Sequence, residues 1–212
     1  MKHIVTAVCT GTARPFHGAE LSAFAKRPRD GRVQVLDHGL APDEQADRSV
    51  HGGPEQALHL YPLDHHAFWR GIIGDHPVLD EPGGFGSNLA VTGLTEQDVH
   101  IGDRFRLGSA LVEVSRPRSP CWKIEHRFGH RGMVARIIET GRCGWYFRVI
   151  ETGDVAAGDV LERVTIGAGK WSVARVFAAL VAGKASPEDL AELAHLPALS
   201  PQLRAKAAAR RT

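Results

Sequence analysis

The sequence predicts a mainly β domain, of the small barrel or sandwich type, followed by a short helical appendage. Its 212 residues include 23 glycines and 12 prolines, a composition typical of short strands joined by tight turns. Short β-rich segments at 4–8, 23–26 and 33–36 are bounded by Gly, Pro and Asp, as strands usually are. Three serine-initiated helix starts then follow one another towards the C-terminus.

The middle of the chain combines helix and strand signals. Apolar residues three and four apart predict a helix over 62–74, with Pro62 at its first position. The segment 103–115 alternates apolar and polar residues on either side of Gly108, which predicts a β-hairpin with a two-residue turn. Three further elements are expected after the hairpin: a helix over 133–140 closed by a glycine, and strands over 145–149 and 160–164.

The end of the chain differs from the rest in charge and pattern. From Thr165 onward seven basic residues stand against three acidic ones, a net charge of +4, whereas the first 164 residues carry −2. Ser172, Ser186 and Ser200 are candidate N-caps, and proline follows the last two. The short apolar faces after them are expected to pack on one another. The sequence therefore predicts a β domain over 1–164 and a three-helix domain over 165–212, whose basic residues we interpret as a solvated face.

Composition excludes several classes of protein. Hydrophobic residues make up 43% of the chain, enough to bury a real core and too many for a disordered protein. The net charge of +2 gives no indication of binding to nucleic acid or to an acidic membrane. No apolar stretch approaches the roughly 20 residues that span a bilayer. Three widely spaced cysteines indicate neither a disulfide framework nor a zinc ribbon, and they fit the reducing cytoplasm.

The strongest chemical signal is the segment RPRSPC, from Arg116 to Cys121. Its two prolines lack backbone donors, so the segment has to leave the sheet as a stiff loop that presents Cys121 at the end of a strand. Arg116 and Arg118 favour the thiolate that a nucleophile or a soft-metal ligand requires. The same arginines can pair with a phosphate group of an anionic cofactor. A buried cysteine beside surface arginines is the alternative interpretation.

Histidine is abundant, with 12 residues, and a cluster contains His51, His59, His65 and His66. In the run VHGGPEQALHLYP, His51 precedes Gly52 and Gly53, whose backbone N–H groups can approach an anion closely. An ordinary turn explains the same run. The chain has neither H-E-x-x-H nor a compact ligand triad, so a zinc hydrolase is not indicated. We interpret most of these histidines as surface or hydrogen-bonded structural residues.

Other polar segments are weaker candidates. The run GGFGSNL, at 83–89, lacks the Lys-Ser/Thr pair of a P-loop, but the carboxamide of Asn88 can donate to and accept from a heterocycle such as a pterin. The acidic run that begins at Asp43 is interpreted as a solvated turn. A Ser-His-Asp hydrolase has no G-x-S-x-G elbow to support it.

Several segments, taken in order, resemble the MOSC domain family, and within it the YiiM-like branch: GLAPDEQAD, VHGGPEQALHLYP, GGFGSNL, GLTEQDVHIGD and VSRPRSPCWK. The segment from about Thr165 resembles the three-helix domain appended to that branch, so the resemblance covers nearly the whole chain. It implies a twisted closed β-barrel with a few helices, a cytoplasmic location and binding of the molybdenum cofactor.

The resemblance also implies roles for individual residues. Cys121 would be the protein ligand to molybdenum. Beside this implied role, our own hypothesis is that a nearby polar group, His51 or His59, supplies the proton that turns the departing oxygen into water. Relatives reduce N-hydroxylated substrates such as hydroxylaminopurines and amidoximes. Because the chain has no iron–sulfur, flavin or dinucleotide fingerprint, the electrons are expected from an external redox protein. The cofactor pocket is expected to include Gly52, Gly53, Asn88, Arg116, Arg118 and Ser119.

Two positions depart from the family pattern, since Pro42 replaces a common glycine and Ser87 replaces a common glutamate. The loss of a carboxylate at Ser87 is expected to affect proton delivery or substrate choice more than cofactor binding. Two alternatives to an enzyme follow. The chain can be a non-catalytic carrier of the cofactor or of sulfur, with a persulfide on Cys121, or it can keep the fold with an inactive site.

Overall fold

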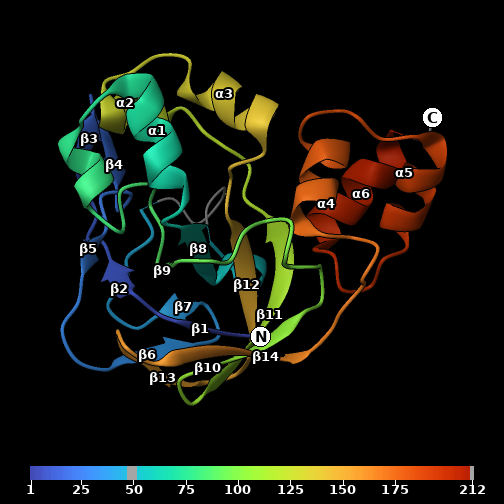
Figure 1. Ribbon diagram of the computed structural model, residues 1–212, viewed down its shortest axis with the longest axis horizontal. Coiled ribbons are helices and arrows are strands. Elements are labelled where there is room, and N and C mark those ends of the chain that lie inside the picture. Colours follow the sequence, from blue (N-terminus) through green and yellow to red (C-terminus); the bar gives the residue numbers. More distant parts are fainter. Residues whose placement is uncertain (47–51, 211–212) are drawn as a thin grey trace.

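A long mixed sheet forms the centre of the computed structural model, which describes residues 1–46 and 52–210 (Figure 1). The sheet has nine strands, in the spatial order β1 (Lys2–Ile4), β14 (Val160–Thr165), β10 (Arg104–Leu107), β11 (Ala110–Pro117), β12 (Trp145–Glu151), β8 (Leu58–Pro62), β9 (Leu89–Val91), β2 (Ala7–Thr10) and β5 (Arg27–Pro28). Only β8 and β9 pair in parallel among these described strands. Because the pairings form a series with two ends, closure into a barrel stays a prediction.

Smaller elements surround the long sheet. A second sheet contains β13 (Gly153–Val155), β6 (Val33–Leu36) and β7 (Gly39–Leu40), and a hairpin contains β3 (Arg14–His17) and β4 (Glu20–Ser22). Two short 3-10 helices are η1 (Pro54–Gln56) and η2 (Pro77–Asp80).

The α-helices form two groups (Figure 1). The first group lies together over one end of the sheet and contains α1 (His65–Ile73), α2 (Lys123–Phe128) and α3 (Met133–Thr140). The second group lies beside β11 and contains α4 (Val173–Leu180), α5 (Pro187–Ala194) and α6 (Pro201–Ala209). Within it, α5 packs on α6, and α4 packs on both α6 and β11. The expected three-helix packing is therefore present, and the helices also cover the sheet.

One hydrophobic core runs through both groups of elements. Phe105 and Leu107 point inward from β10 and alternate with half-buried arginines, as the pattern predicted. Phe177 of α4 and Leu193 of α5 belong to the same continuous cluster as these strand residues. Because the hydrophobic core extends from the sheet into the C-terminal helices, side-chain packing does not separate the chain into two domains. The boundary between 164 and 165 stays a prediction.

Several predicted elements are confirmed. The hairpin pairs Leu107 with Ala110, on either side of the two-residue turn that begins at Gly108. The helix α3 ends at Gly141, whose φ of 72° is the left-handed conformation that glycine adopts most easily. The strands β12 and β14 also lie where the alternation of apolar residues placed them.

Three predicted elements differ from the structure. The strand predicted over 4–8 is interrupted, because β1 ends at Ile4 and β2 begins only at Ala7. Pro62 does not open a helix, because it is the last residue of β8 and pairs with Val91 of β9, so α1 begins only at His65. The segment 23–26 is not a strand. The backbone N–H of Lys26 bonds back to the carbonyl of Phe24 at 2.9 Å, and this local turn replaces pairing with a neighbouring strand.

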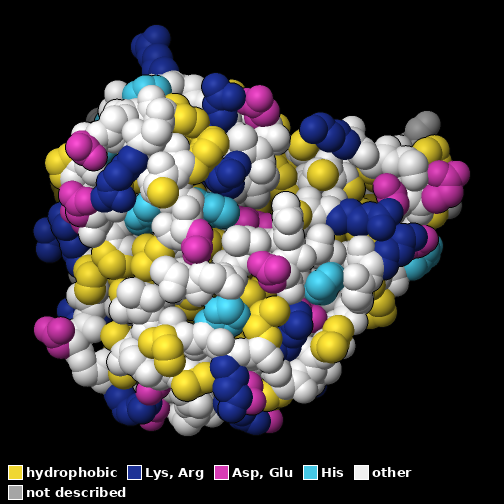
Figure 2. All heavy atoms as spheres, viewed as in Figure 1, with side chains coloured by type: hydrophobic (Ala, Val, Ile, Leu, Met, Phe, Trp, Pro, Cys, Tyr) yellow, Lys and Arg dark blue, Asp and Glu magenta, His cyan; other side chains and the backbone are white. Residues whose placement is uncertain are grey.

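Basic and acidic side chains are interspersed on the face of the molecule that Figure 2 shows. In the C-terminal segment, Lys170 of the turn before α4 pairs with Glu192 of α5, and Arg175 of α4 pairs with Asp189 of α5. Part of the basic excess is thus balanced locally, as expected of a solvated helical face. In the described part of the chain, none of the helices has the length and apolar character needed to cross a bilayer.

Candidate functional site

The RPRSPC segment leaves the sheet where its prolines require it. The strand β11 ends at Pro117, and the backbone N–H of Arg118 then donates to the carbonyl of Gly144 at 3.1 Å. A Cβ on Gly144 would lie 2.3 Å from the carbonyl oxygen of Leu60, so the anchoring turn needs glycine there. The loop ends at Cys121, whose carbonyl accepts from Ile124 in the first turn of α2. Cys121 is therefore held between two anchored elements.

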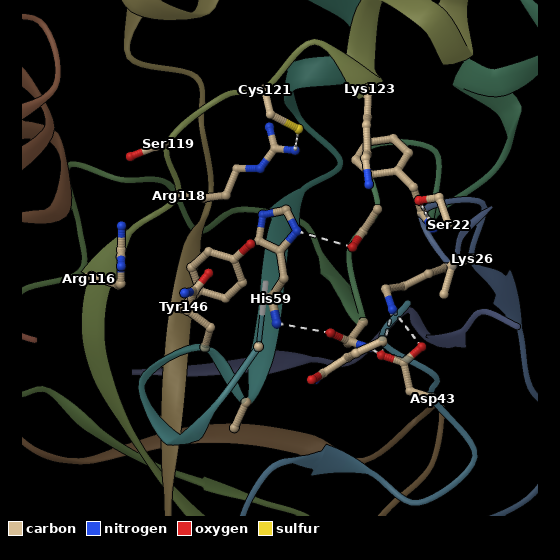
Figure 3. A pocket seen from close by; sticks show the side chains of 18 of the residues that line it. Ser22, Lys26, Asp43, His59, Arg116, Arg118, Ser119, Cys121, Lys123 and Tyr146 are labelled. Carbon is tan, nitrogen blue, oxygen red and sulfur yellow. Dashed lines mark hydrogen bonds and ion pairs between the residues drawn. The ribbon is translucent and has the colours of Figure 1, made fainter. Parts of the chain in front are cut away.

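A buried guanidinium lies beside the sulfur of Cys121 (Figure 3). The Nη2 atom of Arg118 is 4.0 Å from Cys121 Sγ, and its guanidinium carbon lies 5.8 Å from the centre of the Phe24 ring. Arg118 is only 4% exposed. The structure thus places positive charge next to the thiol, which is the arrangement that the sequence motif predicted, and Cys121 itself is half-buried.

Cys121 lines a cavity of about 600 Å³. The cavity brings together seven of the predicted site residues, namely Gly52, His59, Asn88, Arg116, Arg118, Ser119 and Cys121. Gly53 does not line it and instead precedes η1 with a positive φ of 81°. The predicted His51 lies outside the described residues. One cavity therefore unites residues from β8, the turn before β9, and the loop after β11.

His59 is a neutral side chain in the wall of this cavity. Its Nδ1 lies 3.3 Å from the carbonyl oxygen of Gly86, and its ring lies 5.1 Å from the ring of Tyr146. Burial, together with the charge of Arg118, lowers the pKa of His59 to about 3. At neutral pH the imidazole is therefore uncharged, and its Nδ1–H donates to the carbonyl of Gly86.

Asn88 is fully engaged in holding the wall together. Its Oδ1 accepts from the backbone N–H of His59 at 3.1 Å, and its Nδ2 donates to the Cys9 carbonyl at 3.3 Å and to Asp43 at 2.8 Å. Asp43 also binds Lys26 at 2.5 Å and the N–H of Gly11 at 2.8 Å. The carboxamide that was expected to contact a pterin is therefore used to join β8, β2 and the loop at Asp43.

The interpretation of Asp43 as part of a solvated turn is wrong. Its side chain is 6% exposed, and its ion pair with Lys26 stands in the cavity wall (Figure 3). A buried pair of this kind persists because each charge has a partner and additional hydrogen bonds. By contrast, His65 and His66 are structural, as expected, since they bond to Glu96 and to the Leu79 carbonyl.

Comparison with known proteins places this fold and site in a family. The family model of the MOSC domain matches residues 47–162, and the model of the YiiM-like 3-alpha helix domain matches residues 171–212. The chain belongs to the MOSC domain family. It is 40% identical to Protein YiiM of Escherichia coli over 158 residues, which are 74% of this chain and 70% of that protein.

Other relatives support the same MOSC branch. A Gibberella moniliformis protein named Reductase is 40% identical over 182 residues, 85% of this chain. The match spans only 32% of that longer relative. The crystal structure of YiiM from Geobacillus stearothermophilus superposes with a TM-score of 0.84 at 28% identity, over 99% of this chain and 100% of that one. The YiiM-like resemblance of the sequence is thus confirmed.

The departure of this MOSC chain at Ser87 lies outside the cavity. Ser87 is completely buried, and its hydroxyl donates to the carbonyl of Pro82 at 3.1 Å. It is not one of the residues that line the cavity. The expected effect of this position on proton delivery therefore has no direct route through the Ser87 side chain.

Sequence reasoning missed several residues of the MOSC site. Lys123 follows the RPRSPC motif by two residues, and the others come from segments far from it: Lys26, Asp43, Tyr146, Gln202 and Lys206. The only available signal for Tyr146 was its place in a predicted strand, and Lys206 was counted only as part of the basic tail. Neither signal indicates which residue the folded chain brings to the cavity.

Proposed function

We propose that this MOSC protein binds the molybdenum cofactor through Cys121 and reduces N-hydroxylated compounds of the hydroxylaminopurine or amidoxime type. An external redox protein supplies the electrons. One observation carries the proposal, namely the position of Cys121 at a cavity of about 600 Å³ beside the buried Arg116 and Arg118. A cavity of this size is suitable for a cofactor or a small substrate.

The residues around the cavity fit this cofactor. The sulfur of Cys121 is a soft donor of the kind that suits a thiophilic metal. Arg116 and Arg118 are 7% and 4% exposed, and neither is ion-paired with a carboxylate among the described residues. Buried cations without acidic partners suit an anionic ligand, such as a phosphate-bearing pterin dithiolene. When bound, this cofactor supplies two-electron oxygen-transfer chemistry.

The side chains that line the cavity would bind the cofactor and orient the substrate. Arg118 holds positive charge beside the sulfur, and Phe24 and Tyr146 offer aromatic surface to a flat substrate. Reduction of an N–OH group to N–H consumes two electrons and two protons and releases water. His59 is neutral at physiological pH, so it serves as part of the wall and not as the proton donor. His51, the other candidate for the proton donor, lies outside the described residues, so its role stays a prediction.

Two comparisons support an oxidoreductase. The chain matches the MOSC domain, for which the sequence resemblance implies binding of the molybdenum cofactor, and one relative carries the name Reductase. The specific substrate and the cofactor rest on the cavity and on the resemblance of its motifs.

Elemental analysis of protein from a host that makes the cofactor tests the proposal. We expect about one molybdenum per chain in the wild type and none in Cys121→Ala. Cys9→Ala is the matched control, because Cys9 is buried and does not line the cavity, so this variant should keep its metal. The metal-loaded protein should then reduce an N-hydroxylated purine with an artificial reductant. Labile sulfur on Cys121 without metal or turnover would instead favour the sulfur carrier.

A further inference from the structure

Arg116 is a buried cation that forms no ion pair with a carboxylate among residues 1–46 and 52–210. It lies in β11, is 7% exposed, and its Nη1 donates to the neutral Oε1 of Gln202 at 2.5 Å. Its Nε has no hydrogen-bond partner in the part of the chain that the structure describes. Glu55 is a carboxylate close enough to influence Arg116, but Arg148 already binds it. A buried charge in this state is unfavourable unless a ligand supplies the opposite charge.

A second cation comes to the same place from the C-terminal helices. Lys206 lies one turn after Gln202 on α6, so both side chains are on one face of the helix, and both line the cavity. Burial and the charges of Arg210 and Arg116 lower the pKa of Lys206. None of the ion pairs among the described residues involves Lys206. The docking of α6 on the sheet thus places two like charges around one opening.

The donors at this place suit a tetrahedral oxyanion. With its oxygen turned towards Arg116, Gln202 keeps an NH2 group that has no acceptor among the described residues. Arg116 offers a planar set of N–H groups, and Lys206 offers a compact ammonium. Figure 3 shows Arg116 on the side of the pocket opposite Lys26 and Asp43, away from the Asp43 carboxylate that is paired with Lys26.

We propose that Arg116, Gln202 and Lys206 form a binding site for a phosphate monoester, built jointly by β11 and α6. The identity of the molecule that carries the phosphate rests on the proposed function: it is either the cofactor or an N-hydroxylated nucleotide substrate. In both cases the three-helix domain completes the pocket, because α6 supplies two of the three residues that would bind the phosphate.

Calorimetric titration of cofactor-free protein with inorganic phosphate tests the site without any catalytic readout. Removal of one charge-assisted contact should weaken binding about tenfold to a hundredfold in Lys206→Met. Lys184→Met is the matched control, since Lys184 is an exposed lysine in the same domain that does not line the cavity. Equal affinity in both variants, or no binding to the wild type, would overturn the site.

The variant Gln202→Glu gives a second test, because stability and phosphate affinity are expected to change in opposite directions. Its carboxylate would sit against Arg116 as a permanent counter-ion, so we expect a higher melting temperature together with at least about tenfold weaker phosphate binding. Gln202→Ala serves as the control for the loss of the carboxamide alone. Unchanged phosphate binding by Gln202→Glu would contradict the proposal.

Measurements on the metal-loaded enzyme identify the molecule that carries the phosphate. If it is the substrate, Lys206→Met should raise KM about tenfold or more for an N-hydroxylated nucleoside monophosphate, with no change for the nucleoside and full molybdenum content. If it is the cofactor, molybdenum content should fall and both substrates should be affected alike. No change in any of these quantities would overturn the assignment to either molecule.

The two proposals fail separately. A wild-type protein that binds phosphate through Lys206 but contains no molybdenum and reduces neither substrate would contradict the proposed function alone. A loaded, active enzyme in which Lys206→Met behaves as the wild type in every measurement would contradict the phosphate site alone.

Discussion

His59 illustrates how the environment of one residue decides its chemistry. As a free side chain it would titrate near neutral pH, but in β8 it is 3% exposed and lies within the influence of Arg118. Both effects disfavour the imidazolium, so the pKa falls to about 3. The histidine that the sequence offered as a proton donor is therefore a neutral hydrogen-bonding group in the folded protein.

This low pKa predicts an acid sensitivity of folding. Between about pH 6.5 and 3 the unfolded chain binds a proton at His59 that the folded chain does not, so stability falls as the pH falls. From pH 7 to pH 5 the contribution is about 2 kcal/mol. Urea unfolding of the wild type and of His59→Gln at the two pH values measures it. Equal losses in the two proteins would show that His59 is not responsible.

Some polar residues around the cavity belong to a sequence motif and could be predicted, whereas others belong to no motif. Arg116, Arg118 and Cys121 share one short segment, so prolines and charge already indicated a rigid, cationic cysteine site. Lys26 and Asp43 meet only because Asn88 and the N–H of Gly11 hold the carboxylate in place. No spacing along the chain predicts a contact of this kind.

At the scale of single elements, helix ends differ more than their similar sequences suggest. Ser186 caps α5 in a full capping box, because its hydroxyl accepts from the N–H of Asp189 and the Asp189 side chain accepts from the N–H of Ser186. Ser200 precedes α6 with the same Ser-Pro sequence, but its hydroxyl is buried and makes no hydrogen bond to any described residue. The expected serine cap is therefore present in α5 and missing in α6.

This contrast gives a matched pair of substitutions. Ser186→Ala removes a cap and should lower the free energy of unfolding by about 1 kcal/mol. Ser200→Ala removes only an unsatisfied buried hydroxyl, so the change should stay within roughly 0.5 kcal/mol or be stabilising. Urea denaturation followed by circular dichroism measures both. A larger loss in Ser200→Ala than in Ser186→Ala would mean that the Ser200 hydroxyl has a stabilising role.

On the scale of the whole molecule, Arg148 joins the sheet to the C-terminal helices. From β12 its guanidinium binds Glu113 of β11 at 2.6 Å, Glu55 of η1 at 2.5 Å, and the carbonyl of Ala198 at 2.9 Å. The backbone N–H of Ser200 also donates to the carbonyl of Ser115 at 3.0 Å. These bonds set the position of α6 against β11, and with it the side of the cavity that contains Lys206.

Removal of this link should destabilise the protein and loosen α6. In Arg148→Met two carboxylates and a carbonyl lose their shared partner, which should cost roughly 2–4 kcal/mol. Arg136→Met removes an exposed ion pair with Glu139 and should cost less than about 1 kcal/mol. Urea unfolding measures stability, and hydrogen exchange measures the protection of α6. Unchanged exchange in Arg148→Met would contradict the role of Arg148 in docking the helix.

The sequence by itself determined the features that depend on neighbours in the chain. The hairpin at Gly108, the helix closed by Gly141 and the stiff loop that presents Cys121 all follow from turn chemistry, periodicity and proline, which act over a few residues. Each of the MOSC motifs is also a short segment of consecutive residues, so the sequence alone was enough to recognise the family.

Only the tertiary structure decided which distant groups share the cavity. It neutralised His59 by burial and paired Lys26 with Asp43. It also brought Lys206 of the C-terminal helices to Arg116 of the sheet. Burial and contacts between remote segments depend on how elements dock, and a pattern along the chain does not specify docking, because many arrangements bury the same apolar faces. The physical reason is that the protonation state and the hydrogen bonds of a side chain depend on the residues around it in space, and these cannot be read from its neighbours in the sequence.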